Sequence, residues 1–309
     1  VRIDMRRDRV QGGGEWRSAT GPLRRVGVQA SVSDYEHREI EDGAVGTVFR
    51  TRGGDLRVDA VHRTVDLGGW TLDGSMGLQA ERSRFEALGD EAFVPSTRTR
   101  QLAVFASEDL TVSPQWRLQA GLRAERVRVS SDGDAAGTTE PRFGDPRQRD
   151  FSPRGAVLAA VWQPAVAWQA ALQWSSTQRA PTHYELYAEG VHVATGAYER
   201  GDPAQALERG RQWDARLQWR DGDRQASFAW FRARYANYIA LAGTGTPVDD
   251  GEGGSLPLMV FEGVAARLQG WEAEWRDRLP WGPAGSAPTW SLAVDQVRGD
   301  DLDRGTALP

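Results

Sequence analysis

The 309-residue sequence lacks cysteine, lysine and any long apolar run. Without cysteine the chain has neither a disulfide framework nor a thiolate metal site. All 38 basic residues are arginines, scattered along the chain among 43 acidic residues, which argues against a nucleic-acid-binding patch. No segment approaches the roughly 18 apolar residues of a membrane helix. A helical membrane protein is therefore excluded, whereas a membrane barrel, whose strands are apolar at every second position, is not.

Strict alternation of apolar and polar residues is the main signal that is present. In QWRLQAGLRAE, residues 115–125, every second residue from Trp116 onward is apolar, and the others are Arg, Gln, Gly or Glu. A period of two predicts a strand with one apolar and one wet face. No comparable stretch keeps a helical period, so we predict an all-β chain of about a dozen strands. Further strands are predicted to begin near Val26, Leu56, Trp70, Trp168, Trp213, Trp271 and Trp290.

The predicted connections alternate between short and long. The long ones are residues 83–98, 130–150, 178–210 and 240–263. Outer-membrane barrels have short periplasmic turns, long outer loops and aromatic girdles, which Trp168 and Trp174 at the two ends of one strand would match. We therefore predict a transmembrane antiparallel β-barrel whose long connections face the cell exterior. The alternative is a soluble sandwich that buries its tryptophans.

Several motifs resemble those of one receptor family. Residues 176–209, STQRAPTHYELYAEGVHVATGAYERGDPAQALER, resemble the loop region of TonB-dependent outer-membrane receptors, with Arg-Ala-Pro, Glu-Leu and Gly-Asp-Pro in the family's order. The pattern is weaker at residues 204–206, and His183 with Tyr184 replaces smaller or acidic residues. ANYIALAG followed by RLQGWEAEW also resembles the family. DYEHREIEDGAVGTVFRTRG (residues 34–53) and FEALGDEAFVPSTRTRQLAVF (residues 85–105) resemble its zinc-uptake branch.

The resemblance implies a 22-stranded barrel with an N-terminal plug, energised through the TonB complex. Residues 1–309 would then be a partial barrel domain, because the sequence starts in mid-strand and stops in a loop. We expect the plug, the TonB box and the C-terminal strands to lie outside these residues. The resemblance also implies a monomer in the lipid of the Gram-negative outer membrane. It implies no cofactor, with zinc or a metal chelate as the transported ligand.

A first candidate metal site follows from strand parity. The strand that starts near Val26 is apolar at even positions, so His37, Glu39 and Glu41 fall on the lumen-facing side at its outer end. Zinc accepts imidazole and carboxylate ligands, and this spacing puts three of them on one wall. The alternative is a solvated strand extension, and a one-residue bulge would invert the parity.

A second candidate lies in the long connection 178–210. His192 is close in sequence to Glu185, Glu189 and Glu199, and the connection 83–98 offers Asp90 and Glu91. We predict that His192, with Glu91 as the first carboxylate, helps to capture a divalent cation. Glycines in this connection would let it close over the lumen as a gate. The alternative is a surface histidine without a ligand. His62 is interpreted as interfacial, and for His183 a ligand role and a packing role both stay open.

Enzymatic functions find no support in the sequence. It has no His-Glu-x-x-His, no Gly-x-Ser-x-Gly and no phosphate loop, so we predict no catalytic residue. The predicted function is an outer-membrane TonB-dependent active-transport receptor for a divalent metal such as zinc. A ferric-siderophore receptor is the alternative, and a passive porin-type channel is less favoured. Histidine and carboxylate favour a bare ion, whereas aromatic and arginine-rich outer loops favour a chelate.

Overall fold

The computed structural model describes residues 2–41, 43–89, 92–135, 137–138, 141–192, 194–249, 253–278 and 288–308. These residues form seventeen strands and one helix. Twelve strands are 12–26 residues long: β1 (Arg2–Arg17), β2 (Leu23–Glu41), β3 (Ala44–His62), β5 (Thr71–Gly89), β6 (Thr97–Ser113), β7 (Trp116–Ser131), β9 (Arg154–Ala165), β10 (Trp168–Arg179), β13 (Glu208–Asp221), β14 (Arg224–Asp249), β15 (Ser255–Arg278) and β16 (Thr289–Asp301). The short elements are β4 (Val65–Asp66), β8 (Arg147–Phe151), α1 (His183–Tyr187), β11 (Glu189–His192), β12 (Ala197–Arg200) and β17 (Thr306–Ala307). The helix α1 is too short to span a bilayer.

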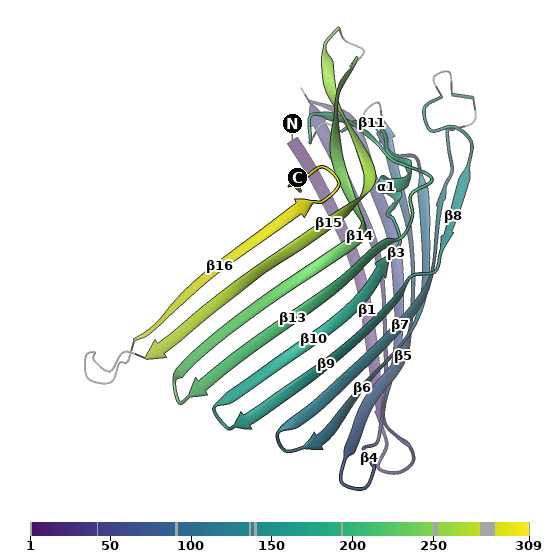
Figure 1. Ribbon diagram of the computed structural model, residues 1–309. Coiled ribbons are helices and arrows are strands. Elements are labelled where there is room, and N and C mark those ends of the chain that lie inside the picture. Colours follow the sequence, from purple (N-terminus) through teal and green to yellow (C-terminus); the bar gives the residue numbers. More distant parts are fainter. Residues whose placement is uncertain are drawn as a thin grey trace.

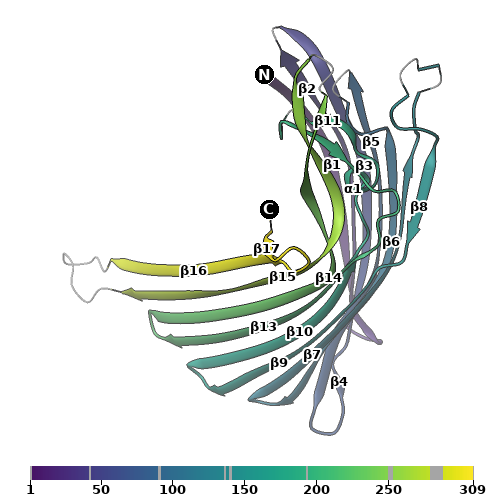
Figure 2. The same cartoon turned by 45° about the horizontal axis from the view of Figure 1, so that its top comes forward.

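The twelve long strands form one continuous antiparallel sheet in chain order, from β1 to β16. The sheet curves like part of a barrel wall, and its strands are tilted (Figures 1 and 2). The prediction of an antiparallel β-barrel sheet is confirmed, and its dozen strands correspond to the twelve long ones. The convex face carries apolar side chains in register, for example Leu78 opposite Val104 and Leu102 opposite Ala80.

Large apolar side chains are exposed on this convex face. Leu78, Leu102 and Leu122 are 52%, 54% and 67% exposed. A contiguous apolar surface of this kind marks a contact with lipid or another apolar partner. Residues of the opposite parity, such as Phe85 and Ala87 in β5, are buried against the connection from β10 to β13 in the concave side. The alternation read from the sequence therefore separates an apolar outer face from an inner wall.

The two ends of the sheet differ. Short turns join β6 to β7, β9 to β10 and β13 to β14 at the lower end in Figure 1, which we call the turn end. Tryptophans pair there, with ring centroids 5.9 Å apart for Trp116 and Trp162 and 5.8 Å for Trp219 and Trp275. The two longest connections, from β7 to β9 and from β10 to β13, lie at the opposite end, which we call the loop end.

One predicted loop was wrong. Residues 240–263 were expected to form an outer loop, but β14 and β15 run on through most of this range as a long hairpin. Their pairing continues from Ile239 opposite Gly263 to Asp249 opposite Ser255, with a register shift between Gly243 and Pro247. Strand pairing thus overrides the glycine-rich, turn-like sequence of this segment.

Candidate ligand-binding site at the loop end

The connection from β10 to β13 is an ordered unit rather than an open loop. It contains α1, β11 and β12, and it lies against the concave wall near β3 and β14 (Figures 1 and 2). Thr182 caps α1: the Glu185 backbone N–H donates to Thr182 Oγ1 at 3.4 Å, and the Thr182 N–H donates to Glu185 Oε2 at 2.7 Å. The predicted all-β fold is confirmed, and α1 is a five-residue helix within it. The Thr-x-x-Glu spacing of a capping box was the sequence signal for it.

Two anchors hold this connection in place. The guanidinium of Arg179 donates to both carboxylate oxygens of Glu185 at 2.8 and 3.0 Å, and to both of Glu208 at 3.2 and 2.9 Å. The side chain of Leu186 is fully buried. A Cβ on Gly201 would come within 2.7 Å of the Leu186 backbone carbon, so this glycine serves close packing. The gating role predicted for the glycines has no support in this packed arrangement.

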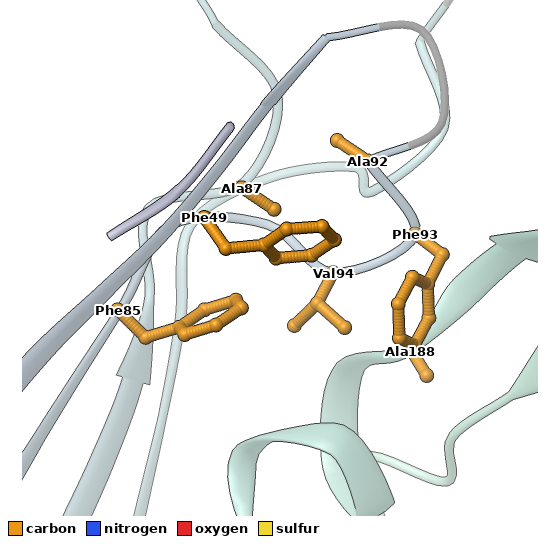
Figure 3. Close-up of a cluster of buried hydrophobic side chains, with 7 residues drawn as sticks. All are labelled: Phe49, Phe85, Ala87, Ala92, Phe93, Val94 and Ala188. Carbon is orange, nitrogen blue, oxygen red and sulfur yellow. The ribbon is translucent and has the colours of Figure 1, made fainter. Parts of the chain in front are cut away.

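A cluster of buried apolar side chains joins the connection to the wall (Figure 3). Phe49 comes from β3 and Phe85 from β5, whereas Phe93 follows β5 and packs beside Ala188 of the connection. Tyr184 of α1 packs against the same cluster. The cluster therefore joins β3, the region in and just after β5, and the connection from β10 to β13, which lie far apart in the sequence.

Three of the four histidines pack against these phenylalanines, one on each ring; the rings of His37 and His192 are stacked and that of His183 is tilted. The ring centroids of His37 and Phe49 lie 4.5 Å apart, those of His183 and Phe85 4.7 Å, and those of His192 and Phe93 4.3 Å. Tyr184 bridges the group, 5.5 Å from Phe85 and 5.9 Å from Phe93. We call the three histidines, the three phenylalanines and Tyr184 the imidazole–aromatic cluster. Its composition combines metal-binding nitrogens with flat ring faces.

The three imidazoles differ in their surroundings. Burial lowers the pKa of His183 to about 4, so its ring is neutral at pH 7, and its Nε2 atom has no hydrogen-bond partner. The Nδ1 atom of His37 also lacks a partner among the described residues. His192 is oriented: its Nδ1 lies 2.9 Å from Oε1 of Glu199, a carboxylate that is 3% exposed. Because a carboxylate only accepts, Nδ1 carries the hydrogen, and in the neutral form of the ring Nε2 is the nitrogen with the free lone pair.

The predicted site residues are not gathered into one coordination sphere. His37 and Glu39 fall on the inner parity as expected, since the pairing of β2 with β3 is regular from Arg25 to Glu39. His37 and His192 stack on different phenylalanines of the cluster. Glu91 lies outside the described residues, as does the side chain of Glu41. Within the described ranges, no group of three His, Asp or Glu side chains has an arrangement that could hold a metal ion.

The structure also shows the surroundings of His62 and His183. His62 lies at the turn end, where its Nε2 is 3.0 Å from Oε2 of Glu108 and its Nδ1 is 2.6 Å from the Arg63 carbonyl oxygen. The packing role left open for His183 is the one seen here. The phenylalanine cluster was missed in the sequence analysis. The carboxylate that contacts His192 is Glu199 from the same hairpin, three residues beyond a tight turn at Gly196.

A curved antiparallel sheet with an apolar convex face and its long connections at one end defines a membrane β-barrel protein. Residues 6–309 match the family model described as TonB dependent receptor-like, beta-barrel. The chain therefore belongs to the TonB-dependent receptor family. Members of this family are receptors of the Gram-negative outer membrane and not enzymes, which confirms the predicted localisation and the exclusion of catalysis.

Solved structures with the same fold include receptors for several ligands. The copper transporter OprC has a TM-score of 0.76 at 15% identity, covering 99% of this chain and 49% of that one. The Serratia marcescens hemophore receptor HasR, solved with its hemophore and heme, has 0.68 at 16%, covering 94% and 49%. The ferric citrate transporter FecA has 0.69 at 13%, covering 99% and 45%. The chain thus spans about half the length of these structures, and at such identities the likeness shows the fold alone.

Proposed function

We propose that this chain is part of a TonB-dependent active-transport receptor that captures a divalent metal ion, zinc above all. A complete receptor would add the plug and the remaining strands, act as a monomer and draw energy from the TonB complex. The imidazole–aromatic cluster at the loop end would meet the substrate first. This placement follows from the expectation that the loop end faces the cell exterior.

The observation that carries the proposal is the pairing of His192 with Glu199. Metal-binding imidazoles donate their second ring N–H to a carboxylate, which fixes the tautomer and strengthens the ligand nitrogen. His192 has this arrangement, and its side chain is 32% exposed, so Nε2 is accessible to an incoming ion. Zinc then needs further oxygen or nitrogen ligands, and Glu91 remains our first choice for one of them.

A metal chelate is the second candidate. The buried phenylalanines do not favour it, because Phe49, Phe85 and Phe93 are only 8%, 7% and 2% exposed. The similar structures named above include receptors for heme and ferric citrate as well as for copper. A ferric siderophore would therefore be the alternative substrate.

Calorimetry on the complete receptor tests the proposal. We expect His192→Ala to lower zinc affinity about 10- to 100-fold, and Glu199→Gln to have an effect of similar order through the orientation of His192. His62→Ala, which removes the histidine at the turn end, is the matched control and should leave zinc affinity unchanged. Equal zinc binding in His192→Ala and in the control, or tighter binding of a ferric chelate, would contradict the metal-ion assignment.

A further inference from the structure

Six arginines form a compact array on the convex face of the sheet, towards the loop end. In one row Arg52 lies opposite Arg84, which lies opposite Arg98. In the next row, two residues closer to the turn end, Arg82 lies opposite Arg100, which lies opposite Arg128. All six have the same parity as the exposed apolar residues of their strands, so they share the outer face.

This array places like charges directly opposite each other, which destabilises a sheet unless counter-ions are present. Four of the six arginines have carboxylate partners: Arg52 with Asp34, Arg84 and Arg98 with Asp132, and Arg128 with Asp150. The side chains of Arg82 and Arg100 form no ion pair or hydrogen bond in the described part of the chain, and both residues are exposed. The centre of the array therefore lacks a counter-ion from the protein.

Two adjoining hollows lie at this place. The first, about 540 Å³, is lined by Arg52, Arg82, Arg84, Arg98 and Arg100 among others. The second, about 490 Å³, is lined mainly by apolar atoms, among them those of Gly12, Ala30, Leu56 and Ala80. The two hollows share Val10, Val32 and Arg82. A cationic pocket thus opens directly into an apolar groove.

The groove exists because small residues align across the strands. Gly12 lies opposite Ala30, and Val32 in the next row lies opposite Gly54. Larger neighbours such as Leu56 and Leu102 continue the apolar surface on either side of Ala80. The arginine rows lie on the loop-end side of this apolar surface. With the loop end facing the cell exterior, as proposed above, we place these rows at the level where outer-leaflet headgroups meet the hydrocarbon region of the bilayer.

We propose that this composite hollow binds a phosphorylated glycolipid of the outer leaflet, lipid A. Arg82 and Arg100 would hold a phosphate group of its headgroup, and the apolar groove would take one acyl chain. Guanidinium groups bind phosphate through paired, charge-assisted hydrogen bonds, and exposed basic clusters at a membrane surface attract anionic lipids. The adjoining apolar groove favours a lipid over free phosphate. This inference concerns the outer face and does not depend on which substrate is transported.

Binding of diphosphoryl lipid A to the complete receptor, refolded in lipid A-free detergent, tests the proposal. We expect Arg82→Gln/Arg100→Gln to weaken binding by about tenfold or more, because each charge-assisted bond lost removes a full contact to phosphate. Arg82→Lys/Arg100→Lys keeps the charge without the bidentate geometry and should fall in between. The matched control, Arg117→Gln/Arg216→Gln, removes equal charge from the concave face and should stay within about twofold.

Two further probes separate phosphate and acyl-chain recognition. Dephosphorylated lipid A should bind the unaltered receptor at least about tenfold more weakly than the diphosphoryl form. Ala30→Leu fills the groove and should weaken binding of lipid A but not of inorganic phosphate. Equal binding of lipid A to the Arg82/Arg100 variant and to the control would overturn the proposal. So would equal binding of the dephosphorylated lipid, or inorganic phosphate binding as tightly as lipid A. Heat-modifiable migration of every variant checks that it is folded.

Discussion

Acidification should loosen the connection between β10 and β13 through a single residue, His183. This imidazole packs between Phe85 and Tyr184 at ring distances of 4.7 and 4.2 Å, and it is buried without a partner for Nε2. Burial lowers its pKa to about 4. The unfolded or undocked segment has a pKa near the ordinary value of about 6.5, so it takes up a proton first as the pH falls.

The size of the effect follows from the two pKa values. Because the docked state has the lower pKa, its stability is complete above about pH 6.5 and declines as the pH falls towards 4. At pH 5 the loss amounts to about 2 kcal/mol, whereas at pH 7 it is only about 0.2 kcal/mol. A change of 2 kcal/mol corresponds to roughly a 30-fold larger population of the undocked segment.

Hydrogen exchange of the α1 segment at pH 5, 6 and 7.5 measures this population, after correction for the intrinsic pH dependence of exchange. Protection should fall at pH 5 in the parent protein. It should fall much less in His183→Gln and His183→Phe, which carry no ionisable ring. If all three proteins lose protection equally between pH 7.5 and pH 5, protonation of His183 is not the cause, and the reasoning from its burial is refuted.

Three other expectations concern the same end of the sheet. Arg179→Gln removes the guanidinium partner of two mostly buried carboxylates, those of Glu185 and Glu208. Because the Arg179 side chain is itself 41% exposed, we expect docking of the connection to weaken by only about 2 kcal/mol. Faster proteolysis of the connection would measure this loss, and Arg179→Lys should be intermediate. Leu186→Ala should cost about 2–5 kcal/mol in docking of the connection, seen by hydrogen exchange, while heat-modifiable migration stays unchanged. Residues 1–309 contain no native cysteine, so single cysteines can be introduced in the complete receptor and labelled selectively. On intact cells, Thr195→Cys should react with an impermeant label and Gly222→Cys should not. The opposite pattern would reverse the topology.

The sheet was predictable because its signal is local. Alternation within a segment is enough to identify a strand and its apolar face, and it is clear in strands such as β7, from Trp116 to Ala124, and β13, from Trp213 to Trp219. The ends of the strands were not predictable in the same way. β14 and β15 extend through glycine-rich sequence because each supplies the other with a partner, and a single segment does not reveal its partner.

The candidate site was predictable only in part. His37 and His192 were identified by residue type and parity, but the phenylalanines beneath them were not. Phe49, Phe85 and Phe93 come together because the register of β3 and β5 places the first two on one face and the turn after β5 brings in the third. That convergence depends on contacts between distant segments. The Thr182–Glu185 capping box, in contrast, was a local signal that the sequence offered.

In β5, residues of the two proposed binding surfaces lie only three positions apart on opposite faces of the strand. Arg82 points to the outer face and belongs to the arginine array, whereas Phe85 points inward and belongs to the imidazole–aromatic cluster. A slip of one residue between β5 and its neighbours would turn the phenylalanine towards lipid and the arginine towards the interior. Both proposed surfaces therefore depend on the same register. Uninterrupted pairing of β5 with β3 and with β6 over fifteen residue pairs each maintains it.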